Sequence, residues 1–190
     1  AYEAGARWIV LCDTNGGSLP DEVGAIVAEV AKTVPGAHLG IHAHDDCGCA
    51  VANSLAAVEA GARQIQGTLN GLGERCGNAN LVTLIGALKL KDKYRERFSL
   101  GIDERQLGQL AHVSRALDEM LNRAPNVHAP FVGSSAFATK AGIHASAVLK
   151  DPRTYEHVAP EATGNTRKVL ISDQGGKSNL MAELERIGVT

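Results

Sequence analysis

The sequence lacks three features that would tie it to a membrane, to secretion or to nucleic acid. No apolar run among its 190 residues approaches the roughly 20 residues that a membrane-spanning helix needs. No N-terminal stretch has the pattern of a secretory signal peptide. The 19 basic and 21 acidic residues leave a net charge of only -2. We therefore expect a cytoplasmic protein that binds neither membranes nor nucleic acid.

A disulfide framework is missing as well. The four cysteines, Cys12, Cys47, Cys49 and Cys76, form no pair of C-x-x-C motifs, which favours reduced thiols. Cys47-Gly48-Cys49 could bind a soft metal, although no second thiol pair accompanies it. The composition, 44% hydrophobic and 21% charged, is that of an ordinary globular protein with a core.

A His-x-His pair is the strongest candidate for a functional site. The apolar residues 39–41 are typical of a buried strand, and Asp45 and Asp46 end it. Because alternate residues of a strand point to the same side, His42 and His44 should stand side by side, about 6.6 Å apart. Two neutral imidazoles at that separation can bind one divalent cation, but two nitrogens make an incomplete site. A pair of hydrogen-bonded structural histidines is the alternative.

The first 100 residues repeat a strand, a polar loop and a helix three times. Strands are expected at 7–12, 39–41 and 63–68. Helices are expected from an N-cap at Ser18, at about 50–60 and at 80–91, the first burying Val23, Ile26, Val27 and Val30. Such units form a parallel sheet, and a long loop after each strand is how a (β/α)₈ barrel builds its active face. The sequence predicts the C-terminal portion of a TIM barrel; a small, complete open sheet is the alternative.

The repeat stops past residue 100. Residues 103–123 predict one long amphipathic helix with Leu107, Leu110, Leu117 and Leu121 on one face, and prolines then mark a linker. From Phe131 onward no period is evident, which indicates a loop-rich, partly helical appendage. We thus expect an α/β fold with barrel units at 1–100, a linker helix and catalytic subdomain at 101–165, and the start of a second small subdomain at 166–190. The barrel portion is followed by a small, mainly helical subdomain.

Three loop motifs resemble those of the isopropylmalate, homocitrate and citramalate synthase family. They are Cys-Asp-Thr-Asn-Gly at 12–16, His-Ala-His-Asp-Asp-Cys-Gly at 42–48 and Asn-Gly-Leu-Gly-Glu-Arg-Cys-Gly-Asn at 70–78. The tail motifs at 141–145, 151–156 and 164–167 look most like the citramalate synthase branch, which uses pyruvate. The resemblance spans essentially the whole chain. It implies a metal-dependent acyltransferase on a barrel, which condenses acetyl-CoA with an α-keto acid in isoleucine or leucine biosynthesis.

The resemblance also implies roles for individual residues. His42 and His44 would be metal ligands, and Asn78 a weaker or outer ligand, to Zn²⁺, Mn²⁺ or Mg²⁺. Thr14 would contact the carboxylate of the keto acid, whereas turn chemistry alone favours a strand-end cap.

In the tail, the resemblance makes His144 a proton-transfer group and Tyr155 a hydrogen-bond donor near the thioester. Both would reach the barrel of the partner subunit in a homodimer with exchanged subdomains. From the residues alone, a structural role for His144 is equally open. Glu74 and Arg75 are expected to pair with each other or to orient their loop.

Other functions stay open at this point. Relatives supply a further carboxylate ligand and an arginine from a motif that is absent from this sequence. The alternatives are an isopropylmalate or homocitrate synthase, a related metal-dependent lyase or aldolase, and a non-catalytic metal-binding dimerisation module.

Overall fold

The computed structural model describes residues 1–170, 176, 180–181, 184 and 188. The chain forms two compact units, Ala1–Ile85 and Gly86–Thr190, which are described separately below. Most of the predicted segment 166–190 lies outside the described residues. Among the residues that the structure describes, no helix is long and apolar enough to cross a membrane.

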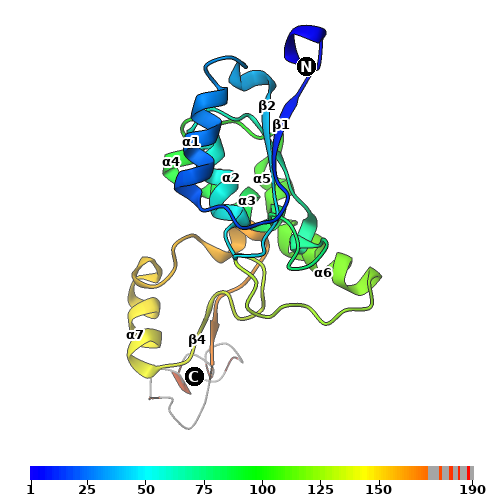
Figure 1. Ribbon diagram of the computed structural model, residues 1–190. Coiled ribbons are helices and arrows are strands. Elements are labelled where there is room, and N and C mark those ends of the chain that lie inside the picture. The colour runs from blue at the N-terminus through cyan, green and yellow to red at the C-terminus, as the bar shows by residue number, and fades with distance from the viewer. Residues whose placement is uncertain (171–175, 177–179, 182–183, 185–187, 189–190) are drawn as a thin grey trace. The chain divides into compact units, whose positions relative to one another are not determined.

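The first unit is a three-stranded parallel sheet with helices in the connections, as expected (Figure 1). Its strands lie in the order β1-β2-β3, so β2 is central. The α1 and α2 helices pack against each other beside the strands. The elements are η1 (Tyr2–Ala4), β1 (Ile9–Asp13), α1 (Pro20–Val30), η2 (Gly36–His38), β2 (Leu39–Ala43), α2 (Ala50–Glu59), β3 (Gln64–Gln66), η3 (Leu69–Gly71) and α3 (Leu81–Leu90), the last ending in the second unit.

The register of the sheet brings the polar loops to one edge. Cys12 of β1 lies opposite His42 of β2, and His42 lies opposite Gln66 of β3. Because the strands are parallel and in step, the loops that follow them leave the sheet at the same end. The predicted site residues of the first unit lie in these loops or at the last strand positions.

The core of the first unit explains why β2 is so apolar. Leu39, Ile41 and Ala43, which alternate along β2 and so share one face of the strand, are almost completely buried. Val23 and Val27 of α1 pack in one cluster with Leu39 and Ile41. Burial of a side chain of this size contributes about 1.5–3 kcal/mol relative to exposure, so these residues fix the position of the strand that carries His42.

Several local predictions need correction. The α1 helix begins at Pro20 with Leu19 as N-cap, not Ser18, because the Glu22 carboxylate accepts the Leu19 backbone N–H at 2.8 Å. Ile26 is 54% exposed and does not belong to the buried stripe of α1. The long helix predicted at 103–123 is broken into two helices around Gly108, and Leu121 is 45% exposed beyond the end of the second.

The second unit is mainly helical. Its buried apolar side chains include Leu107, Phe131, Phe137 and Val148. Buried Thr163 donates its hydroxyl to the Phe131 carbonyl at 3.0 Å, which fastens η5 to the segment before β4. The elements are α4 (Asp92–Arg95), α5 (Glu104–Leu107), α6 (Leu110–Met120), β4 (Ala138–Thr139), α7 (Gly142–Lys150), η4 (Pro152–Thr154), η5 (Pro160–Thr163) and β5 (Lys168–Val169), with β4 and β5 parallel.

Candidate functional site

Backbone hydrogen bonds bring the loop after β3 against the end of β2. His44 pairs with Asn78 in an isolated antiparallel bridge, and the Ala79 N–H donates to the Ala43 carbonyl at 3.0 Å. On the other side, the His44 N–H donates to the Asp13 carbonyl of β1 at 3.2 Å. The main chain itself therefore places residues from all three strand ends next to one another.

The two predicted metal-binding histidines lie next to each other, with their rings edge to face. The ring centroids of His42 and His44 are 5.2 Å apart at an interplanar angle of 73°. The Asn78 side-chain nitrogen Nδ2 lies 3.1 Å from Nε2 of His42, within hydrogen-bond distance. This contact places the side chain of Asn78 beside the predicted ligand His42.

A second observation concerns the buried nitrogen of His44. Its Nδ1 is shielded from solvent and has no hydrogen-bond partner among the described residues. Buried polar atoms without a partner are uncommon and call for an explanation such as a bound ion or water. The donor set of two imidazoles and one amide suits a divalent cation. It is incomplete, since no group of three or more His, Cys, Asp or Glu side chains in the described part of the chain is arranged to hold a metal.

Two glycines in the loop after β3 make room for Asn78. A Cβ on Gly73 would collide with Oδ1 of Asn78, so a side chain there would push the amide out of place. Gly77 has φ +98°, in the left-handed region, and a Cβ on it would collide with the Gly71 carbonyl. The Asn78 N–H donates to that same carbonyl at 3.1 Å. The glycine-rich sequence at 71–77 therefore serves to position Asn78.

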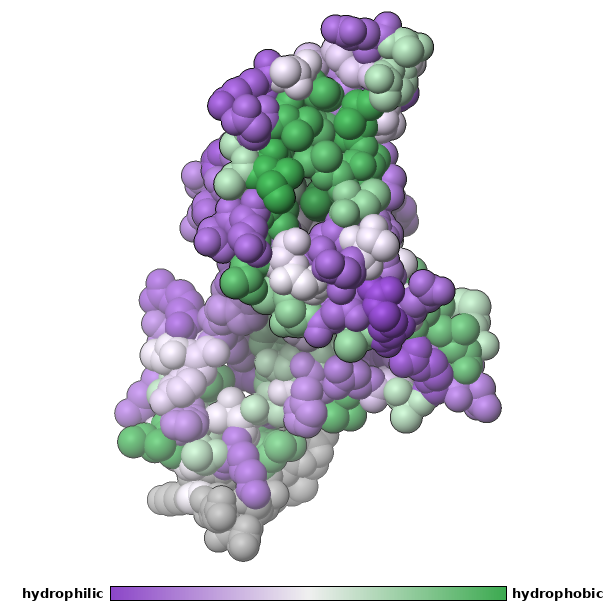
Figure 2. All heavy atoms as spheres, in the orientation of Figure 1, coloured by the Kyte–Doolittle hydropathy of each residue, from purple (hydrophilic) through white to green (hydrophobic). Residues whose placement is uncertain are grey.

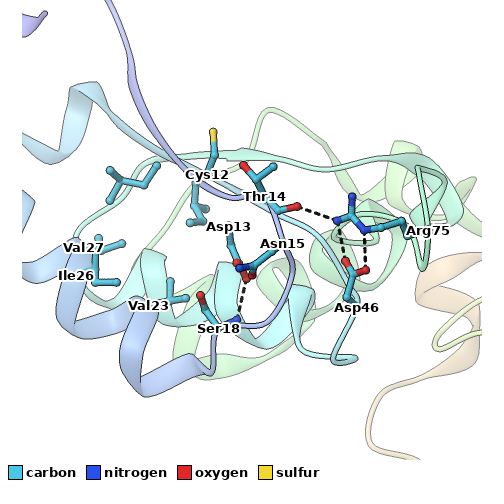
Figure 3. A pocket seen from close by; sticks show the side chains of 12 residues that line it. Cys12, Asp13, Thr14, Asn15, Ser18, Val23, Ile26, Val27, Asp46 and Arg75 are labelled. Carbon is cyan, nitrogen blue, oxygen red and sulfur yellow. Dashed lines mark hydrogen bonds and ion pairs between the residues drawn. The ribbon is translucent and has the colours of Figure 1, made fainter.

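An ion pair ties the three loops together. The Arg75 guanidinium donates to both carboxylate oxygens of Asp46, at 2.7 and 2.9 Å, and to the Thr14 carbonyl at 2.8 Å (Figure 3). These hydrogen bonds hold the pKa of Asp46 below its usual value. The expectation that Arg75 orients its loop fits this arrangement. The alternative prediction, an ion pair between Arg75 and Glu74, is wrong, because the side chain of Arg75 pairs with Asp46.

A groove of about 820 Å³ runs alongside β1 and α1 and contains Thr14. Figure 2 shows apolar atoms gathered over this region, and Figure 3 shows Thr14, Asp46 and Arg75 at the other, polar end of the groove. Thr14 is exposed and lies one residue beyond β1. His42 and His44 do not line this groove. Thr14 is linked to the loops near the histidines through Arg75 rather than through a shared cavity wall.

The four cysteines are free thiols, as the sequence predicts. A hydrogen bond with Cys47 raises the pKa of the Cys49 thiol, and desolvation adds to this effect.

The two tail residues singled out by the sequence lie together in the second unit. His144, in the first turn of α7, and Tyr155, directly after η4, have ring centroids 4.5 Å apart and planes tilted by 37°. They line a pocket of about 390 Å³ together with residues 136–141 and 156–157. Tyr155 is 52% exposed, so its ring is available to a ligand. No sequence pattern indicated the ion pair between Glu156 and Arg167, which lies beside Tyr155.

Comparison with known proteins agrees with this architecture. The HMGL-like family matches residues 1–113, and the homocitrate synthase post-HMGL domain-like family matches residues 131–190. The chain belongs to the HMGL-like family. The fold is accordingly α/β, a portion of a TIM barrel followed by a mainly helical subdomain, as predicted.

Among similar proteins, (R)-citramalate synthases are about 50% identical to this chain over the aligned residues. The proteins from Synechocystis sp. and Geobacter sulfurreducens are 51% and 52% identical over the whole chain, which covers 35% of each. Homocitrate synthase AksA from Methanopyrus kandleri is 40% identical, with 46% of its length covered. The chain thus spans about a third of the length of the citramalate synthases that it matches.

Solved structures agree on the fold. An HMG-CoA lyase from Acinetobacter baumannii, in complex with coenzyme A and 3-methylmalate, superposes with a TM-score of 0.55 at 30% identity, over 67% of this chain and 42% of the lyase. The carboxyl transferase domain of Rhizobium etli pyruvate carboxylase superposes with a TM-score of 0.51 at 23% identity, over 64% of this chain and 19% of that one.

Proposed function

We propose that the full-length gene product condenses acetyl-CoA with an α-keto acid, pyruvate being the best candidate, to give citramalate. The observation that carries the proposal is the proximity of His42, His44 and Asn78 at the ends of parallel strands: the two imidazole centroids are 5.2 Å apart, and Nδ2 of Asn78 lies at hydrogen-bond distance, 3.1 Å, from Nε2 of His42. The roughly 50% identity to (R)-citramalate synthases favours pyruvate as the keto acid.

In this proposal His42 and His44 would hold a divalent cation, Zn²⁺, Mn²⁺ or Mg²⁺, with Asn78 as a weaker or outer ligand. When bound, the ion supplies Lewis-acid polarisation of the keto group. The Thr14 hydroxyl donates a hydrogen bond to the carboxylate of the keto acid and orients it. Arg75 holds the Thr14 loop and the Asp46 loop in a fixed relative position. The Thr14 hydroxyl is thereby kept in place for binding the keto acid.

The remaining chemistry falls to the tail residues. His144 accepts a proton from the acetyl methyl group, the methyl carbon then bonds to the keto carbon, and the keto oxygen takes up a proton. Water subsequently cleaves the thioester and releases free CoA, which makes the overall reaction irreversible. The Tyr155 hydroxyl donates a hydrogen bond near the thioester.

The biological setting is part of the proposal. We infer a role in branched-chain amino-acid biosynthesis, in the cytoplasm, for a homodimer in which each tail reaches the barrel of the partner subunit. In this arrangement, His144 and Tyr155 of one subunit act on a keto acid that is bound in the barrel of the partner subunit. Nucleic acid and membranes have no part in it.

A lyase of the same family is the second candidate, favoured by the 30% identity to the HMG-CoA lyase structure. Two assays, one for condensation and one for cleavage of 3-hydroxy-3-methylglutaryl-CoA, separate the two. Purified full-length protein is mixed with acetyl-CoA, Mn²⁺ or Mg²⁺, and pyruvate, 2-oxoisovalerate or 2-oxoglutarate, and free CoA is followed with a thiol reagent. We expect CoA release with pyruvate and loss of this release on addition of a chelator.

CoA release with 2-oxoglutarate or 2-oxoisovalerate instead of pyruvate would indicate another synthase of the family. A protein that cleaves 3-hydroxy-3-methylglutaryl-CoA and condenses nothing would be a lyase, and one that binds metal but does neither would be a non-catalytic module.

A further inference from the structure

The short turn that carries Tyr155 is attached to the rest of the second unit by an ion pair. The Arg167 guanidinium donates to both carboxylate oxygens of Glu156, through Nε and Nη2, each at 2.6 Å. The Glu156 side chain is only 8% exposed and that of Arg167 is 32% exposed. A bidentate pair of this kind fixes orientation as well as distance, because both groups are planar.

The position of this pair relates the two rings that line the pocket. Arg167 directly precedes β5, which pairs with β4, and β4 leads into α7 with His144 in its first turn. Glu156 directly follows Tyr155, whose backbone N–H donates to the Pro152 carbonyl at 3.1 Å. The Glu156–Arg167 ion pair therefore connects the turn of Tyr155 to the small sheet from which the helix of His144 starts.

A second ion pair at the other end of the same turn offers a contrast. Arg153 binds Asp151 at 2.8 Å, but its side chain is 89% exposed, and both partners lie within η4 and its cap. An exposed pair between near neighbours in the chain constrains little beyond the turn itself. The Glu156–Arg167 pair, by comparison, is largely buried and spans 11 positions of sequence.

We propose that Glu156 and Arg167 are positioning residues, whose ion pair holds Tyr155 against His144 at the distance that the reaction requires. The proposal rests on the proposed catalytic role of Tyr155. A displacement of about 1 Å in a catalytic group can lower a rate about 10²-fold, so a pair that touches no substrate can still control turnover.

The test is a double-mutant cycle in the full-length protein, with CoA release from acetyl-CoA and pyruvate as the readout. We expect Glu156→Gln and Arg167→Lys each to lower kcat about tenfold and to leave KM for pyruvate within about twofold. In a Tyr155→Phe background, the same substitutions should lower kcat by less than about twofold, because the group that they position is gone. Arg153→Gln, which removes the exposed pair, is the matched control and should keep wild-type kcat.

The outcomes separate the two levels of the proposal. An equal loss of kcat in both backgrounds would show that the pair only supports the fold, and wild-type kcat in Glu156→Gln and Arg167→Lys would also overturn the positioning role. If Tyr155→Phe alone retained wild-type kcat, the catalytic role of Tyr155 would fail first, and the positioning role with it. Should Glu156→Gln not fold, as judged by its melting temperature, Arg167→Lys, which keeps the positive charge beside Glu156, carries the cycle by itself.

Discussion

The two candidate sites of this chain are positioned by different parts of the protein. In the first unit, the main chain positions the site: His42 lies within β2, and backbone hydrogen bonds hold His44 and Asn78 beside this strand. In the second unit, Tyr155 follows a three-residue turn, and a side-chain ion pair next to it provides the long-range anchor. Activity at the first site should therefore depend most strongly on the ligands themselves, and the second site should be sensitive to residues that never touch substrate.

The largest effect is expected from the histidine pair. His42→Ala or His44→Ala should abolish detectable CoA release and weaken Mn²⁺ binding by at least about 10²-fold, since each substitution removes a direct ligand. Titration calorimetry with Mn²⁺ on the full-length protein measures this directly. His112→Ala, at an exposed histidine on α6, is the matched control. Mn²⁺ affinity that is unchanged in His42→Ala would remove the metal assignment.

A smaller but still large effect is expected for His144. His144→Ala should lower kcat about 10²-fold, which is typical of a general acid or base, without changing the affinity for Mn²⁺. Steady-state kinetics combined with the Mn²⁺ titration distinguish this residue from the metal ligands. The exposed His128 provides the control substitution. Near-normal turnover in His144→Ala would assign the proton transfer to another residue.

The Arg75–Asp46 pair tests whether the first site depends at all on side-chain anchors. Arg75→Gln removes three hydrogen bonds that join the loops, and we expect KM for pyruvate to rise about tenfold, through looser placement of Thr14. Arg95→Gln breaks an exposed ion pair on α4 and should have no such effect. If Arg75→Gln lowered CoA release as much as His42→Ala does, the first site would depend on side-chain anchors as strongly as the second, and the proposed difference between the two sites would be wrong.

The smallest effect concerns the pH dependence of stability. Burial, together with the nearby positive charge of Lys91, lowers the pKa of His157, the residue that follows Glu156. Because the unfolded chain then binds a proton more readily than the folded one, stability should be full above the unfolded value of about 6.5 and fall as the pH drops below it.

Melting temperatures between pH 7.5 and pH 5 would check this expectation. The decline should be less steep in His157→Gln, which cannot take up the proton, than in the wild type. His112→Gln serves as the control and should show the wild-type slope. Identical slopes in His157→Gln and the wild type would mean that His157 does not contribute to the acid sensitivity.

The sequence predicted best what depends on local pattern. The alternation of strand, polar loop and helix gave the parallel sheet, and the spacing of His42 and His44 placed their rings on one side of the strand. Helix boundaries were less secure: nothing local distinguished Ser18 from Leu19 as an N-cap, and Gly108 was not recognised as a break. Partners distant in sequence could not be predicted, since Arg75–Asp46 and Glu156–Arg167 exist only because the fold brings separate loops together.

The central claim is that His42 and His44 bind one cation together. Electron spin-echo envelope modulation of Mn²⁺ bound to the full-length protein measures it most directly, because it detects nitrogen atoms coordinated to the ion. We expect the signal of two imidazole nitrogens in the wild type and of one in either His42→Ala or His44→Ala. A wild-type spectrum without coordinated nitrogen would contradict the account.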